Sequence, residues 1–245
     1  MPEVVALFLA ATATMLATGV GALPVIWLGD RALRLRGALW GLAAGTMAVA
    51  SVTGLLLPAL DEGSSGQVIA GLAAGGAFVL VARWLVDVDQ AHRGADGRAR
   101  DAIIVFAVLF VHSLPEGLAI GTAWASTTAG LSAFVVAAIG LQNIPEGTAT
   151  AIPLRLAGYG PWRQIWAATL TSLPQPIGAL LAYAAVEEVS SLLPLSFAFA
   201  AGAMLVLVGY ELLPNALHER PRRSAVGGIV VGAAAMLALG AVLGV

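Results

Sequence analysis

The chain has 245 residues, of which 59% are hydrophobic and only 11% are charged, and its mean hydropathy is +0.91. Soluble globular proteins have about a quarter of their residues charged and under half apolar. The composition therefore excludes a soluble enzyme, a disordered chain and a nucleic-acid binder, and it predicts a polytopic membrane protein. The net charge of −2 gives no attraction for phosphate, and the absence of cysteine excludes disulfides and thiolate ligands.

A membrane-spanning helix needs about 20 predominantly apolar residues, and eight such stretches follow one another along the chain. Alternating polarity is absent from them, which argues against an outer-membrane barrel. The first stretch lacks the basic start of a signal peptide, so we interpret it as a helix. We predict an all-α bundle of eight transmembrane helices that forms one domain over 1–245. The predicted spans are 4–28, 37–60, 66–86, 102–124, 131–152, 164–186, 191–213 and 225–243.

The distribution of arginine predicts the topology, because all twelve basic residues are arginines. They lie in or beside the first, third, fifth and seventh connections, whereas the connections 61–65, 125–130 and 187–190 contain none. Positive charge marks the cytoplasmic side of a membrane protein. We therefore predict cytoplasmic odd-numbered connections and two extracytoplasmic termini. The longest hydrophilic segment, 87–101, is expected to be a flexible cytoplasmic loop.

Two internal repeats are present. His112-Ser-Leu-Pro-Glu-Gly-Leu-Ala119 and Gln142-Asn-Ile-Pro-Glu-Gly-Thr-Ala149 match at Pro, Glu, Gly and Ala with a constant offset of thirty residues. A weaker similarity joins 41–47 in the second span to 199–204 in the seventh, which runs in the opposite direction. Similarity between oppositely directed helices is typical of an inverted-topology transporter repeat, although chance similarity between Ala/Gly-rich helices is the alternative.

Three acidic residues, Glu116, Glu146 and Glu211, lie inside apolar spans. An ionised side chain near the bilayer centre opposes insertion by roughly 2.5–3.5 kcal/mol. We expect no Lys or Arg at comparable depth to pair with these glutamates. Protonation, water or a bound cation must therefore compensate their charge.

The spacing of the neighbouring polar residues favours a cation. His112 and Glu116 are four residues apart on one helix, so the imidazole and the carboxylate project from the same face. Gln142 and Glu146 repeat this spacing on the next helix. One imidazole nitrogen, two carboxylates and an amide oxygen suit a borderline divalent metal such as Zn²⁺, Fe²⁺ or Mn²⁺. A buried histidine that only hydrogen-bonds between helices is the alternative.

Further polar residues flank this candidate site. Ser113 and Asn143 lie three residues before the two glutamates and add donors beside them. Pro115 and Pro145 each remove a backbone N–H, which predicts disturbed helical turns at membrane depth. Gln175 lies between two prolines in the sixth span, where it either joins the ligands or fills a kink.

A last polar series lies at the cytoplasmic end of the seventh span. Glu211, Asn215 and His218 have the spacing i, i+4, i+7 and are expected to line one helix face. We interpret this face, with Glu211 and His218 as its ligands, as an exit path for the metal. A hydrogen-bonding cluster at the membrane interface is the alternative.

The segments HSLPEGLAIG and LQNIPEGTATAIPL resemble the paired motifs of the ZIP family of metal-ion transporters. The resemblance extends to TGVGALPV in the first span, GLAAGTM in the second, and FAAGAML followed by ELLP in the seventh. It thus covers nearly the whole chain in the family's order and is nearest to the prokaryotic GufA-like branch.

This resemblance implies transport of Zn²⁺, and often Fe²⁺, Mn²⁺ or Cd²⁺, into the cytoplasm across the inner or plasma membrane of a prokaryote. It also implies a site between the fourth and fifth helices and an elevator-like motion of one helix group against the other. By motif, the residues of the primary metal site are His112, Glu116, Gln142 and Glu146, and those of a weak second site are Ser113, Asn143 and Gln175. Ser113, Asn143 and Gln175 stand where many members have Asn, Asp and Glu, while Tyr210 and Asn215 replace acids. These neutral residues argue against a two-metal centre and a strongly acidic exit path.

Two other functions remain as alternatives to a divalent-metal importer. The buried glutamates could relay protons in a proton-coupled carrier of another solute. A metal-bound water could also serve an intramembrane hydrolase, but the chain lacks an HExxH pair and an obvious nucleophile. We expect no cofactor, and the expected partners are divalent metal ions and the lipid bilayer. Nucleic acid is excluded, and whether the chain forms a homodimer is left open.

Overall fold

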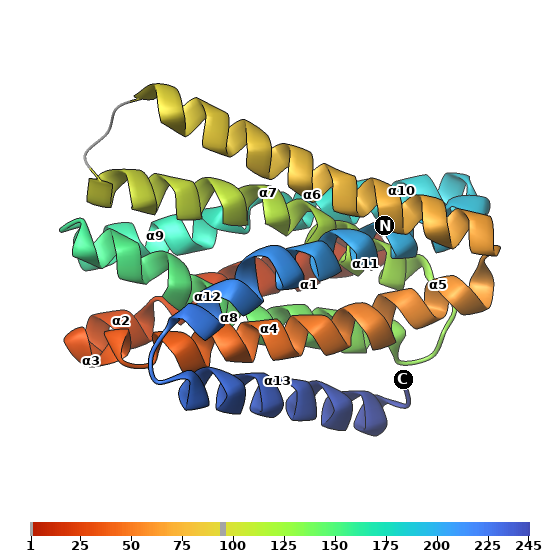
Figure 1. Ribbon diagram of the computed structural model, residues 1–245. Helices are drawn as coiled ribbons and strands as arrows, with labels where there is room; N and C mark the ends of the chain where they lie inside the picture. Colours follow the sequence, from red (N-terminus) through yellow and green to blue (C-terminus); the bar gives the residue numbers. More distant parts are fainter. Residues whose placement is uncertain (1, 94–96) are drawn as a thin grey trace.

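The computed structural model describes residues 2–93 and 97–245, and over these residues it contains helices and no strand, which confirms the all-α prediction (Figure 1). The elements in chain order are α1 Pro2–Gly21, α2 Leu23–Leu28, α3 Asp30–Leu33, α4 Arg36–Ser51, η1 Val52–Leu56, α5 Leu57–Glu62, α6 Ser65–Arg93, α7 Gly97–Ala125, α8 Leu131–Leu156, α9 Pro161–Thr171, α10 Pro174–Glu188, η2 Ser190–Leu192, α11 Leu193–Leu207, η3 Val208–Leu212, α12 Leu213–His218 and α13 Arg222–Leu243.

Six stretches of the described chain are long and apolar enough to cross a membrane, and each coincides with a predicted span. They are Pro2–Leu28, Arg36–Glu62, Ser65–Val86, Phe106–Ala125, Ser190–His218 and Arg222–Leu243. The two other predicted spans, 131–152 and 164–186, are also helical. Helix α8, which covers 131–152, carries buried polar residues. The predicted span 164–186 is divided between α9 and α10. The protein is therefore an all-α polytopic membrane protein.

The helices alternate in direction, so that their connections gather at two ends of the bundle (Figure 1). Helices α2 and α3 and the α12–α13 connection lie at the left end in this view, while the α5–α6 connection lies at the right. The first and seventh connections are joined by an ion pair in which Arg36 Nε lies 3.4 Å from Glu219 Oε1. This arrangement agrees with the alternation of arginine-rich and arginine-free connections in the sequence.

The segment 87–101 differs from the loop that we predict from its composition. Helix α6 continues to Arg93 and α7 begins at Gly97, so helical backbone occupies most of this segment on both sides of 94–96. Its alanine, glutamine and arginine residues are good helix formers. Extending a formed helix by one residue adds a hydrogen bond without a new nucleation step, so the two helices persist beyond the apolar stretches.

Four helices form a framework group, which we define as α4, α6, α11 and α13 together with η1, α5, η3 and α12. Glycine lets their backbones touch. A β-carbon added at Gly45 would lie 2.2 Å from the carbonyl oxygen of Ile229 on α13. One added at Gly75 on α6 would lie 1.9 Å from the carbonyl oxygen of Phe199 on α11. Two close pairs, α4–α13 and α6–α11, therefore build this group by the small-residue packing that membrane helices use.

The helices α4 and α11 also share an internal feature. A five-residue π-helix, η1 or η3, follows each of them, and a Leu-Pro pair follows each π-helix at 57–58 and 213–214. Because a proline ring crowds the preceding turn, a wider π-turn at this point relieves the clash. Small residues, a π-turn and Leu-Pro thus follow in the same order in two helices of opposite direction, which agrees with the inverted repeat predicted from 41–47 and 199–204.

The remaining long helices form a site group, which we define as α1, α7, α8, α9 and α10. Their backbones are equally close. A β-carbon at Gly147 on α8 would lie 1.8 Å from the carbonyl oxygen of Thr18 on α1. One at Gly121 on α7 would lie 2.1 Å from that of Ala179 on α10. The two polar helices, α7 and α8, are therefore each held by a helix of the same group.

We expect Gly75→Ala to lower the free energy of unfolding by about 1–3 kcal/mol, because the new methyl group must push α6 away from α11. The measurement is the thermal unfolding midpoint of the purified protein in detergent. Gly66→Ala is the matched control, since a β-carbon at Gly66 on the same helix meets nothing within 4 Å. Equal midpoints for the two variants would contradict the close packing of this pair.

Candidate metal centre

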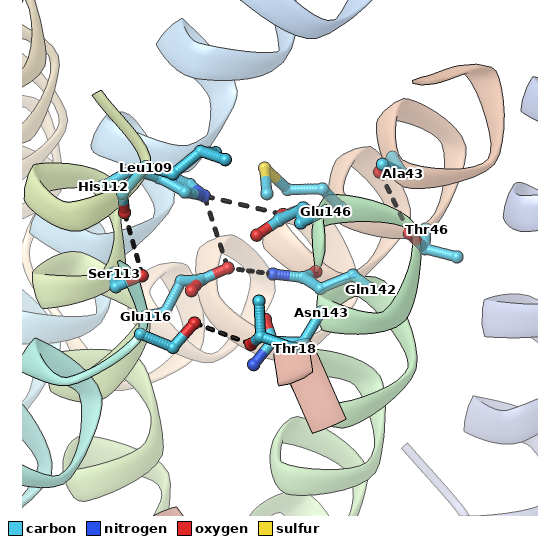
Figure 2. Close-up of polar contacts among 12 residues, drawn as sticks. Thr18, Ala43, Thr46, Leu109, His112, Ser113, Glu116, Gln142, Asn143 and Glu146 are labelled. Atoms are coloured by element: carbon cyan, nitrogen blue, oxygen red, sulfur yellow. Dashed lines mark hydrogen bonds and ion pairs between the residues drawn. The ribbon is translucent and has the colours of Figure 1, made fainter. Parts of the chain in front are cut away.

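The centre is built by two neighbouring helices of the site group. Helix α7 supplies His112 and Glu116, and α8 supplies Gln142 and Glu146, each pair one turn apart on one face (Figure 2). All four side chains are buried. The predicted disturbance at the prolines does not interrupt either helix, because both run continuously through their Pro-Glu-Gly motifs.

The potential ligand atoms are close together. His112 Nε2 lies 3.3 Å from Glu116 Oε1 and 3.7 Å from Glu146 Oε1. One ligand atom from each of these three residues lies within 4.8 Å of the others. Ligands at the usual zinc distances are roughly 3.4 Å apart around a tetrahedral ion. Small side-chain movements would therefore bring all three into the coordination of a single ion.

Several buried atoms of this cluster have no hydrogen-bond partner within the described part of the protein. They are both ring nitrogens of His112, Gln142 Oε1 and Glu146 Oε1. His112 Nε2 is near Glu116, but the geometry is not that of a hydrogen bond. Since buried polar groups are nearly always bonded, such a group of atoms without partners is typical of a ligand-binding site. A nitrogen, an amide oxygen and carboxylates are the donor set of a borderline divalent metal.

The two polar atoms of the Gln142 amide have different surroundings. Its Nε2 donates a hydrogen bond of 2.5 Å to Glu116 Oε1, which fixes the orientation of the side chain. Its Oε1 has no partner and is the atom that can coordinate a cation. The structure thus brings together the four residues that the sequence predicts for the primary site.

The predicted second set of ligands forms a neutral hydrogen-bonded network beside Glu116. Gln175 Nε2 donates to Glu116 Oε2 at 2.5 Å and to Asn143 Oδ1 at 3.3 Å. Asn143 Nδ2 donates to the carbonyl oxygen of Thr14 at 2.7 Å. The hydroxyl of Ser113 instead donates to the carbonyl oxygen of Leu109, one turn back on its own helix (Figure 2).

The break between α9 and α10 places Gln175 in this network. Helix α9 ends at Thr171 and α10 begins at Pro174, so Gln175 lies in the first turn of a new helix. Thr14 Oγ1 donates to Gln175 Oε1 at 2.9 Å, and Ser172 and Thr18 share a hydrogen bond of 2.7 Å. Sequence reasoning missed these hydroxyl residues, although repeated threonines in the apolar first span were a signal.

The predicted exit residues, Glu211 and His218, have different partners. Glu211 forms an ion pair with Arg83 of α6, whereas the Nδ1 atom of His218 lies 2.8 Å from the carbonyl oxygen of Pro214 at the exposed end of α12. Residues spaced i, i+4, i+7 share a face only in a regular α-helix, and Glu211 lies in the π-helix η3. The expectation that no arginine reaches the depth of the acids is also wrong for Glu211, because Arg83 extends to it from within α6.

Comparison with known proteins identifies the family. Residues 87–240 match the family model of the ZIP zinc transporters. The zinc transporter GufA of Myxococcus xanthus is 34% identical over 93% of this chain and 95% of its own length. The zinc transporter ZIPB of Bordetella bronchiseptica is 30% identical over 93% of this chain and 78% of its own length. The zinc transporter ZupT of Corynebacterium glutamicum is 30% identical over 90% of this chain and 92% of its own length. The chain therefore belongs to the ZIP family and is of its prokaryotic, GufA-like kind.

Proposed function

We propose that the chain carries divalent metal ions, Zn²⁺ first among them, across the membrane into the cytoplasm, and that His112, Glu116, Gln142 and Glu146 hold the ion in transit. Membership of a transporter family favours this function over hydrolysis. The observation that carries the proposal is the buried cluster of potential metal-ligand atoms on α7 and α8, several of which have no hydrogen-bond partner among the described residues. Two carboxylates balance the charge of one divalent ion, so a bound cation removes the repulsion between two glutamates that lie in a low-dielectric setting.

The experiment that tests this function is zinc uptake by proteoliposomes, measured with an indicator inside the vesicles. We expect Glu146→Gln to reduce uptake to below about a tenth of the wild-type rate, because the amide lacks the charge that balances the ion. Glu188→Gln, which changes an exposed glutamate at the end of α10, is the matched control and should leave uptake unchanged.

Wild-type uptake by Glu146→Gln at equal reconstitution would contradict the assigned site. A wild-type protein that acidifies the vesicles together with another solute, without moving zinc, would favour the proton-coupled carrier instead.

We propose that the centre holds one ion and not two. The amide nitrogen of Gln175 lies within hydrogen-bond distance of both Glu116 Oε2 and Asn143 Oδ1. It therefore occupies the position from which a second cation would bridge these two oxygens. Two divalent ions would leave two positive charges uncompensated, since the residues added by the second set are neutral.

Titration calorimetry should accordingly give one Zn²⁺ per chain, and crystals soaked in Zn²⁺ should give one anomalous peak at full occupancy. We expect the double variant Asn143→Asp, Gln175→Glu to bind a second ion, because it adds two carboxylates where the amides now bond to each other. Gln67→Glu adds a carboxylate in the first turn of α6, away from the centre, and serves as the control. Two full peaks in the wild type would refute the single-ion proposal.

We propose that the site group moves as a body against the framework group, as an elevator. Most close backbone contacts at glycine lie within a group, α1–α8 and α7–α10 in one and α4–α13 and α6–α11 in the other. An exception is Gly130 just before α8, where an added β-carbon would lie 2.4 Å from the carbonyl oxygen of Leu243 on α13. Elsewhere between the groups side chains make contacts, such as the ring of Phe134 on α8 against Gly54 of η1. A surface made of apolar side chains can slide more easily than one where backbones interlock.

One hydrogen bond between the groups offers a test of this motion. The hydroxyls of Thr122 on α7 and Ser196 on α11 are 2.6 Å apart. Because the chain has no cysteine, a Thr122→Cys, Ser196→Cys variant has one pair of thiols. We expect its oxidation to stop zinc uptake and its reduction to restore it.

The matched control is Thr18→Cys, Ser172→Cys, whose hydroxyls are 2.7 Å apart within the site group. Its disulfide should leave uptake near the level of the reduced protein. Uptake that continues in the oxidised Thr122→Cys, Ser196→Cys variant, with the cross-link confirmed by mass, would exclude sliding at this interface.

A further inference from the structure

A cavity between α6, α7 and α11–η3 lies beside both His112 and the Arg83–Glu211 ion pair. His112 lines it on one side, and Arg83 and Glu211 line it on another. The other lining residues are Val79, Leu80, Ala82, Val86, Val108, Val111, Leu207 and Tyr210. Nearly all of the wall is therefore apolar, and Glu211 is the one carboxylate among the described residues that form it.

The ion pair belongs to the framework group on both sides. Arg83 comes from α6 and Glu211 from η3, and the two side chains are only 26% and 11% exposed. Opposite charges that are partly withdrawn from water attract each other more strongly than a surface pair. The π-helix at 208–212 shifts the register of this segment, which agrees with the frequent occurrence of such turns at functional sites.

We propose that the Arg83–Glu211 ion pair is the inner gate of the cation route: it closes the cavity next to His112 and must open before an ion leaves towards the arginine-rich end. This inference rests on the proposed function of the centre. In the sequence, Arg83 serves only to predict which side of the membrane is cytoplasmic. The inference makes it a gating residue for transport.

The charges explain why the closed pair is a barrier. An ion that leaves His112 enters an apolar cavity that offers little to replace its lost ligands. The guanidinium of Arg83 repels the divalent ion, and it also occupies the carboxylate that could receive it. Separation of the pair acts on both obstacles at once, since the carboxylate of Glu211 then no longer bonds to Arg83 and the guanidinium of Arg83 no longer lies across the route.

The accessibility of a single cysteine tests the gate. The chain has no native cysteine, so Val108→Cys places one thiol in the cavity wall, one turn before His112. The rate of modification by a cationic methanethiosulfonate is measured on the purified protein in detergent without zinc. We expect Arg83→Gln and Glu211→Gln to raise this rate at least about tenfold over the Val108→Cys protein, because each removes the ion pair that excludes charged molecules.

Two further variants separate gating from a general loss of structure. Arg83→Lys retains the charge and should keep modification slow. Arg36→Gln breaks the exposed pair with Glu219 and should also leave the rate unchanged. A rate for Arg83→Gln within twofold of the Val108→Cys protein, or fast modification in Arg83→Lys as well, would overturn the gate. Failure of the Val108→Cys protein and the wild type to take up zinc would count against the proposed function alone, since the modification is measured without transport.

Discussion

The constraint on which this structure depends is the burial of two carboxylates, Glu116 and Glu146, at a depth where water cannot solvate them. Each ionised group would oppose insertion by roughly 2.5–3.5 kcal/mol if it had no partner. The protein meets this constraint with His112 beside both glutamates and with amide donors on Glu116. One ligand atom from each of His112, Glu116 and Glu146 lies within 4.8 Å of the others, so the energetic requirement of burial and the proposed binding of a cation have the same structural origin.

Close helix packing makes this cluster geometrically feasible. Residues of α1, α7, α8 and α10 are hydrogen-bonded to one another in this cluster. Glycine at the helix contacts removes the side-chain bulk that would hold these helices apart. A β-carbon at Gly117, next to Glu116, would lie 2.3 Å from the carbonyl oxygen of Gln175. The Pro-Glu-Gly motif therefore combines a ligand with the close approach that its hydrogen-bond partner needs. This is a physical reason for glycine to follow Glu116 directly.

The sequence predicts that His112, Glu116, Gln142 and Glu146 lie together, as they do in the structure, because i, i+4 spacing on two continuous helices determines which side chains share a face. It does not predict Arg83 as a partner of Glu211, since an arginine near the end of an apolar span gives the same sequence pattern whether its side chain faces solvent or another helix. The sequence also does not predict the π-helices, and therefore it does not predict the register of Glu211 relative to His218. The prediction of a loop over 87–101 is wrong for the described residues, which are helical. A polar composition indicates that a segment leaves the membrane, but it does not indicate that the helix ends there.

The amide groups around Glu116 set a limit on how firmly an ion can be held. A carrier must bind its ion well enough to select it and weakly enough to release it. Gln142 and Gln175 each donate a hydrogen bond of 2.5 Å to a different oxygen of Glu116. A metal that binds this carboxylate must compete with both donors, which lowers the net gain on binding. Glu146 Oε1 accepts no hydrogen bond from a described residue, so at the proposed site an ion would meet less competition there than at Glu116.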